Sequence, residues 1–231
     1  MDMKLLGAVS SLGAAATGGG IYYALSDDQS STSISELFKS EKGLKLMTSA
    51  DDPKWNEAWG NYRKDHKVGN SESYKDEDKW RISNWKEKKG EGSAFEEFKK
   101  ECDKRSKVKV KDTNQPEYQD VKKYCSRPKK ISELLSENKG RTLLDKSGDS
   151  TLWNKSWEEY KKTNVQSKTG TAVTYKAQDT WGVEGWSSKQ SLTDAPAEYK
   201  TKCETKLDSY IDPNKLTQDE TFKQVVSWCT K

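Results

Sequence analysis

The chain carries one pattern of residues twice. One stretch runs from Ile34 to Tyr62 and the other from Ile131 to Tyr160, and both contain Ile-Ser-Glu-Leu, two tryptophans four residues apart, and a tyrosine three residues later. The offset between the copies is 97 residues at the isoleucine and 98 at the tyrosine. A near-constant offset of this length indicates a tandem duplication, with each copy a structural unit of its own.

The match continues to the C-terminal end of each copy. The pattern Asp-x-Trp recurs at Asp78 and Asp179 with an offset of 101, and the offset reaches 104 at Cys125 and Cys229. Growing offsets indicate small loop insertions in the second copy. We therefore expect four parts, namely an N-terminal segment (residues 1–26), a polar linker (27–33), a first repeat (34–130) and a second repeat (131–231).

The spacing of the aromatic residues predicts helices with an aromatic core. In each copy the two tryptophans and the tyrosine lie at i, i+4 and i+7, which is one stripe along an α-helix. Because aliphatic residues are scarce, we interpret the matched aromatics as the core, with a sugar-stacking or partner-binding platform as the alternative. The predicted core residues are Trp55, Trp59, Tyr62, Trp80, Trp85, Trp153, Trp157, Tyr160, Trp181 and Trp186.

Signals for helix ends favour an all-α fold, with one small helical bundle per repeat. Gly43 is expected to end the first helix as a left-handed cap, and Ser93 with Glu96 forms a capping box that predicts another helix start. Residues 44–47 are expected to be a short extended link. Residues 65–77 and 163–178 show no clear period and are expected to be polar loops.

Four cysteines occupy two equivalent positions in each repeat. Cys102 precedes Cys125, and Cys203 precedes Cys229, at spacings unlike those of zinc-binding knuckles. We predict one disulfide in each repeat, which would stabilise a small domain by about 3 kcal/mol. Reduced, buried cysteines in a cytosolic protein are the alternative.

The N-terminal segment is long enough to cross a membrane. Residues 5–25 form a run of 21 residues without a charge, rich in glycine and alanine, which predicts a transmembrane anchor with the C-terminal body outside. A cleaved signal peptide is the competing interpretation, and a soluble Gly/Ala-rich tail is the third. The first two both export the body, in agreement with disulfide formation.

The net charge of +4 is unevenly distributed. Residues 33–130 carry 25 Lys and Arg against 19 Asp and Glu, a net charge of +6, whereas residues 131–231 carry 15 of each. The densest basic run, Lys99 to Lys111, would suit an anionic partner such as a glycan, although a solvated helix end is the simpler interpretation. Because the second repeat lacks this run, we consider nucleic acid an unlikely partner.

No catalytic, cofactor-binding or metal site stands out in the sequence. The single histidine, His66, is expected to be solvent-exposed in a polar loop, and the glycines form no phosphate-binding motif. Asp78 and Asp179 are interpreted as helix caps. We therefore predict that the protein is not an enzyme and needs no cofactor. An exported enzyme acting on host polymers through clustered carboxylates is the rival, and it predicts an acid-lined pocket shared by both repeats.

The chain resembles the large paralogous families of uncharacterised proteins of hemotropic mycoplasmas. The resemblance rests on the glycine-rich apolar start with Gly18-Gly19-Gly20-Ile21-Tyr22, the Ile-Ser-Glu-Leu segments, the Trp-bearing helices and the ending Val225-x2-Trp228-Cys229. It implies a membrane-associated, surface-displayed protein subject to antigenic diversification, and it carries no catalytic or ligand residue. The expected function is contact with a host protein or an anionic glycan, antigenic variation, or both. A carbohydrate-binding module using paired tryptophans and a purely structural envelope spacer are the remaining alternatives.

Overall fold

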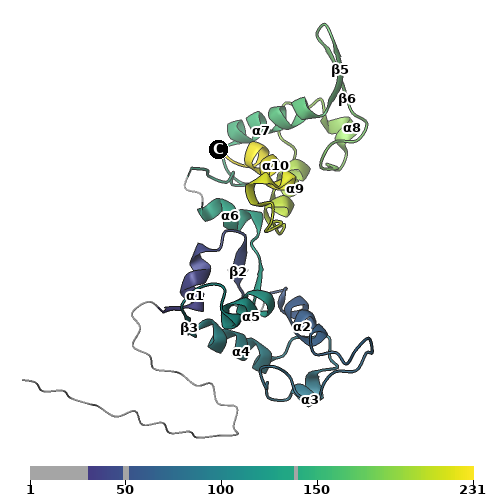
Figure 1. Cartoon of the computed structure of the whole chain (residues 1–231). Helices are drawn as coiled ribbons and strands as arrows, with labels where there is room; N and C mark the ends of the chain where they lie inside the picture. The colour runs from purple at the N-terminus through teal and green to yellow at the C-terminus, as the bar shows by residue number, and fades with distance from the viewer. Residues whose placement is uncertain (1–30, 49–51, 138–139) are drawn as a thin grey trace, which may run out of the picture. The chain divides into compact units, whose positions relative to one another are not determined.

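A computed structural model describes residues 31–48, 52–137 and 140–231, and it shows that the predicted all-α fold is wrong. The described chain is a mixed α/β protein, in which short helices are combined with three two-stranded antiparallel sheets. Residues 31–231 form one compact unit (Figure 1).

Five α-helices occur in the same order in both repeats, whereas the 3-10 helices lie at different places. Those of the first repeat are α1 (Ile34–Leu37), the 3-10 helix η1 (Phe38–Ser40), α2 (Trp55–Lys64), α3 (Trp85–Lys88), α4 (Glu96–Ser106) and α5 (Pro116–Tyr124). Those of the second are α6 (Ile131–Glu137), α7 (Ser150–Thr163), α8 (Trp186–Lys189), α9 (Ala197–Leu207), the 3-10 helix η2 (Leu216–Gln218) and α10 (Glu220–Trp228).

Two of the sheets close the first repeat on itself. Strand β1 (Thr32–Ser33) pairs with β3 (Lys109–Val110), and β2 (Leu44–Leu46) pairs with β4 (Ser126–Pro128). The extended link expected at residues 44–47 is thus a strand with a partner more than 80 residues away. Strands of two or three residues are too short to show an alternating pattern in the sequence.

The third sheet is a hairpin in the second repeat. Strands β5 (Val165–Thr169) and β6 (Ala172–Tyr175) meet at a turn that contains Gly170, whose φ of 60° favours glycine. The loop predicted for residues 163–178 is therefore wrong over these strands. The sequence shows no clear period there because almost every side chain of the hairpin is exposed, so no apolar face marks the strands. The hairpin extends beyond the end of α7 (Figure 1).

The helix starts do not follow the capping signals of the sequence closely. Helix α4 begins at Glu96 after an extended Phe95, so Ser93 is not its N-cap. Helix α7 is capped by Asp149, whose side chain accepts the N–H of Thr151. Helix starts deduced from short motifs are commonly shifted in this way, because several Ser, Thr and Asp residues compete for one cap.

Gly43 is required for close packing and does not form the predicted left-handed cap. Its φ is not positive, and a Cβ at this position would lie 2.7 Å from Leu216 Cδ2 and 2.8 Å from Pro213 Cα. The glycine therefore lets a loop of the second repeat approach the backbone of the first.

The core consists of two hydrophobic clusters, one in each repeat. All ten aromatic residues predicted for the core are buried, with 0–6 % of their surface exposed. Equivalent rings make equivalent contacts in the two clusters. Trp59 packs edge-on against Trp85 with 5.7 Å between ring centroids, and Trp157 packs edge-on against Trp186 with 5.8 Å. Buried aromatic rings replace the scarce aliphatic side chains.

Among the described residues, no helix has the length and apolar character that crossing a bilayer requires. The predicted anchor or signal segment, residues 1–26, lies outside the described residues. The predicted linker, 27–33, is described only at its end, where β1 belongs to the folded body.

Candidate functional site

Both predicted disulfides are present. Cys102 is bonded to Cys125 and Cys203 to Cys229, with Cα–Cα distances of 5.5 and 5.7 Å, within the normal range. Each disulfide links a cysteine within α4 or α9 to the cysteine that directly follows α5 or α10. All four cysteines are at most 2 % exposed. Each bridge thus joins two helices at the centre of an aromatic cluster.

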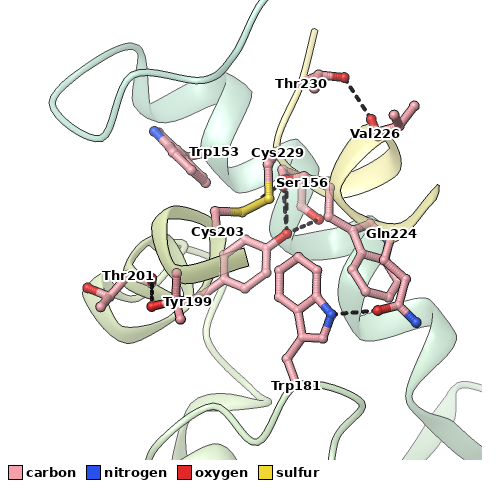
Figure 2. The surroundings of a disulfide bond; sticks show 12 residues. Trp153, Ser156, Trp181, Tyr199, Thr201, Cys203, Gln224, Val226, Cys229 and Thr230 are labelled. Carbon is pink, nitrogen blue, oxygen red and sulfur yellow. Dashed lines mark hydrogen bonds between the residues drawn. A yellow bond between two sulfur atoms is a disulfide. The ribbon is translucent and has the colours of Figure 1, made fainter. Parts of the chain in front are cut away.

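Beside the second disulfide, the core contains a polar network that the first repeat lacks. Ser156 Oγ lies 2.7 Å from the hydroxyl of Tyr199 and donates to the carbonyl of Trp228 (Figure 2). The equivalent residues of the first repeat are Ala58 and Phe98. The two repeats thus differ by both hydroxyls together, and in the second repeat each hydroxyl has the other as a partner, which avoids the cost of an unpaired buried hydroxyl.

A tyrosine and an aspartate form the centre of each repeat. Tyr62 donates its hydroxyl hydrogen to Asp78, whose carboxylate also accepts the backbone N–H groups of Trp80 at 2.9 Å and Ile82 at 3.0 Å. In the second repeat Tyr160 and Asp179 make the same contacts with the N–H groups of residues 181 and 183. The interpretation of these aspartates as helix caps is therefore wrong, because each organises a turn that precedes the helix.

Burial and the neighbouring carboxylate raise the pKa of both core tyrosines. For Tyr62 and Tyr160 burial is the larger cause, followed by the hydrogen bond to Asp78 or Asp179. Since the folded-state pKa exceeds the unfolded value of about 10, the stabilisation is complete below pH 10 and is lost as the pH rises above it. The phenols therefore remain protonated donors at neutral pH.

His66 is buried, so the expected exposed loop histidine is wrong. Its ring Nδ1 lies 2.8 Å from the carbonyl oxygen of Tyr62 and must carry the proton there, while Nε2 accepts the N–H of Lys79 at 2.8 Å. Asn164 makes the same two contacts in the second repeat, to the carbonyl of Tyr160 and from the N–H of Thr180. The two residues are equivalent at an offset of 98, and both join the end of a helix to the aspartate turn.

This equivalence predicts that asparagine can replace His66. We expect His66→Asn to keep most of the stability, and His66→Ala to reduce the free energy of unfolding by about 2 kcal/mol, because it leaves a buried N–H and a carbonyl unpaired. Urea unfolding of both variants measures the difference. Equal losses for the two variants would show that ring packing against Tyr62, not hydrogen bonding, is the main contribution.

The two repeats share a buried ion-pair cluster that the sequence did not indicate. Arg127 is 8 % exposed, and its guanidinium donates to both carboxylate oxygens of Glu133, at 2.7 and 2.9 Å, and to Asp52. The backbone continues the connection, since Lys129 N donates to the carbonyl of Gly43 and Ile211 N donates to that of Lys129. Residues 126–130 therefore pair with both repeats, and the first repeat is not separated from the second by a free linker.

Removing Arg127 is expected to weaken this junction in a pH-dependent way. The hydrogen bonds from Arg127 are the main cause that lowers the pKa of Glu133. A lowered folded-state pKa gives stability that is present above the unfolded value of about 4.3 and lost as the pH falls below it.

We therefore expect Arg127→Ala to cost about 2 kcal/mol at pH 7, and the difference from the wild type to shrink between pH 5 and pH 3. Urea unfolding at a series of pH values measures it. Lys39→Ala, which removes only an exposed ion pair with Glu36, serves as the control and should change stability by less than about 0.5 kcal/mol. A difference that stays constant down to pH 3 would contradict the assigned role of Glu133.

The basic run predicted from the sequence is largely paired with acids. Three of its cations on α4 and the C-cap residue Lys107 contact acids one turn earlier in the helix. These pairs are Lys100–Glu96, Lys104–Glu101, Arg105–Glu101 and Lys107–Asp103. Such internal pairing reduces the field available to an anionic partner.

Acidic residues gather in one cleft of the first repeat. This cleft of about 480 Å³ is lined by Asp76, Glu77, Asp78 and Glu87 among others. Of these acids, only Asp78 has an acidic counterpart in the second repeat, and it is already bonded to Tyr62 and to backbone N–H groups. Within the described ranges, no three His, Cys, Asp or Glu side chains are grouped so that they could hold a metal ion.

Comparison with protein-family models, with curated proteins and with solved structures gives no match to this chain.

Proposed function

We propose that the folded body is an exported, non-catalytic module that presents variable loops to molecules outside the cell. The observation that carries this proposal is the pair of buried disulfides, because such bonds form and persist in oxidising compartments. The four cysteines occupy the same two core positions in both repeats, so the disulfide is a structural feature of the repeated unit.

The contrast between core and loops supports presentation. Four matched tryptophans, the disulfide and the tyrosine–aspartate pair are the same in both repeats, whereas the loop after the tryptophan helix differs in length and sequence. In the first repeat this loop is closed by a single antiparallel β-bridge between the backbones of Lys67 and Tyr74, and in the second repeat it is the β5–β6 hairpin. Each loop exposes a valine, Val68 at 50 % and Val173 at 40 %. A fixed scaffold with divergent exposed loops suits host contact or antigenic variation.

The alternatives find less support in the described residues. The matched tryptophans are buried and have no free face on which a sugar could stack. The carboxylates of the acidic cleft are not repeated as a set in the second repeat, as the enzyme hypothesis requires.

Labelling of intact cells tests this proposal. An antibody against the hairpin, residues 165–175, should stain cells that produce the protein before they are permeabilised, and externally added protease should remove the signal. An antibody against a cytosolic protein should stain only permeabilised cells. If the hairpin antibody also stains only after permeabilisation, the body is not exported and the proposal fails.

A further inference from the structure

Arg63 in helix α2 is a cation without an anionic partner among the described residues. Its guanidinium lies between the rings of Trp59 and Tyr74, with distances of 5.6 and 5.5 Å to the ring centroids. Nη1 donates to two neutral acceptors, the hydroxyl of Tyr74 at 3.4 Å and the carbonyl of Lys89 at 3.3 Å. Nε is buried without a hydrogen-bond partner in the described chain. Nε is too buried to reach a ligand, whereas Nη2 makes no hydrogen bond in the described chain, and its charged N–H groups match a carboxylate.

Arg63 lines a cleft of about 870 Å³. Tyr74 contributes an aromatic ring, and the floor includes Gly90 and Gly92, where an added Cβ would meet no atom within 4 Å. The charged residues of the cleft are Arg63, Lys86, Lys89, Glu72 and Glu87. Mixed charge beside an aromatic ring and open glycines suits a flat, hydroxyl-rich ligand with one negative group.

The second repeat does not offer this chemistry. The residue equivalent to Arg63 is Lys161, which is 5 % exposed, donates to the carbonyl of Leu192 at 2.7 Å and forms an ion pair with Glu158. The positions of Lys86 and Lys89 are occupied by Ser187 and Gln190. The unpaired arginine and its cationic neighbours are thus a feature of the first repeat, which also carries the excess positive charge.

We propose that this cleft binds a carboxylate-bearing sugar residue of a glycan. Arg63 holds the carboxylate through Nη2, Tyr74 packs against the sugar ring, and Glu72 and Glu87 accept hydrogen bonds from its hydroxyl groups. The same two acids repel dianions, which favours a single carboxylate over a phosphate. The inference deepens the proposed function and rests on it only for access of the cleft to an external glycan.

Glucuronate and glucose are matched probes, since they differ chiefly in a carboxylate at one carbon. Titrating each into the purified chain, followed by NMR or calorimetry, should give at least tenfold tighter binding of glucuronate. Arg63→Gln should abolish this preference, and Arg63→Lys should weaken glucuronate binding several-fold, because it keeps the charge but loses the Nη2 donor and the contacts of the guanidinium with Trp59 and Tyr74.

Lys64→Gln is the control, because it makes the same change of charge at an exposed neighbour that does not line the cleft. The melting temperature of each variant shows whether it is folded, and Arg63→Lys keeps the test informative if Arg63→Gln is not. Equal affinity for glucose and glucuronate, unchanged binding in both Arg63 variants, or tighter binding of inorganic phosphate would overturn the assignment. Because purified protein is used, this result is independent of the labelling experiment on cells.

Discussion

Replacing Asp78 or Asp179 by alanine is expected to reduce the free energy of unfolding by at least about 3 kcal/mol. Asp78 is 5 % exposed and Asp179 is 9 % exposed, and each carboxylate accepts one phenol hydroxyl and two backbone N–H groups. Alanine leaves these donors buried without partners, and the full desolvation cost of several polar groups falls on the folded state. Urea unfolding followed by tryptophan fluorescence measures the loss.

The asparagine variants separate hydrogen bonding from charge at the same positions. Asp78→Asn keeps one oxygen for Tyr62 and Trp80 but turns an amide NH2 towards the N–H of Ile82, so we expect an intermediate loss of about 1–2 kcal/mol. Asp76→Ala is the control, since that side chain is 87 % exposed and pairs only at the surface. If alanine at position 78 costs no more than at position 76, the buried carboxylate does not organise the turn.

The parts of the fold that follow from side-chain repetition could be predicted from the sequence. Trp55, Trp59 and Tyr62 form a helical stripe, and the same stripe recurs in the second copy, so their burial could be expected. Two cysteines occur at equivalent positions in each copy, and this repetition predicts one disulfide within each repeat. Repetition acts as an internal alignment, because a residue kept in both copies is under the same packing constraint in each.

The parts that depend on backbone pairing or on contacts between the copies could not be predicted. The strands are short or exposed, so they show no alternating apolar pattern, and the sequence predicts links and loops in their place. The ion pair of Arg127 with Glu133 joins the two repeats and therefore has no duplicate within either one. His66 could have been recognised, because Asn164 lies at the same offset, but the two residues share no obvious property until their hydrogen bonds are seen.

Because residues 126–130 pair with both repeats, the two repeats should respond differently to the loss of their disulfides. Residues 126–130 follow the first disulfide directly and pair with both copies. Cys229, in contrast, is followed by Thr230, which forms a β-bridge with Leu143 of the same repeat. Loosening the end of α5 should therefore affect both repeats, whereas loosening the end of α10 should affect mainly the second.

Removing either disulfide is expected to cost about 3 kcal/mol before any effect of the junction. The loops that the two bridges close differ by only three residues, with sequence separations of 23 and 26, so the effect on the unfolded chain is nearly equal. The double variants Cys102→Ala/Cys125→Ala and Cys203→Ala/Cys229→Ala should therefore differ only through the folded state. Urea unfolding gives the total loss.

Hydrogen exchange measured by mass spectrometry on peptides of each repeat shows which repeat loses amide protection. We expect the first double variant to lower protection in both repeats and the second to lower it mainly in residues 140–231. Wild-type protein treated with a thiol reductant should lose stability equal to the two variants together, because the same two constraints are removed. If reduced protein and both variants were as stable as the wild type, the bridges would contribute nothing to a core with so few aliphatic residues. The body would then have no need of an oxidising compartment, and the argument for export would lose its physical basis.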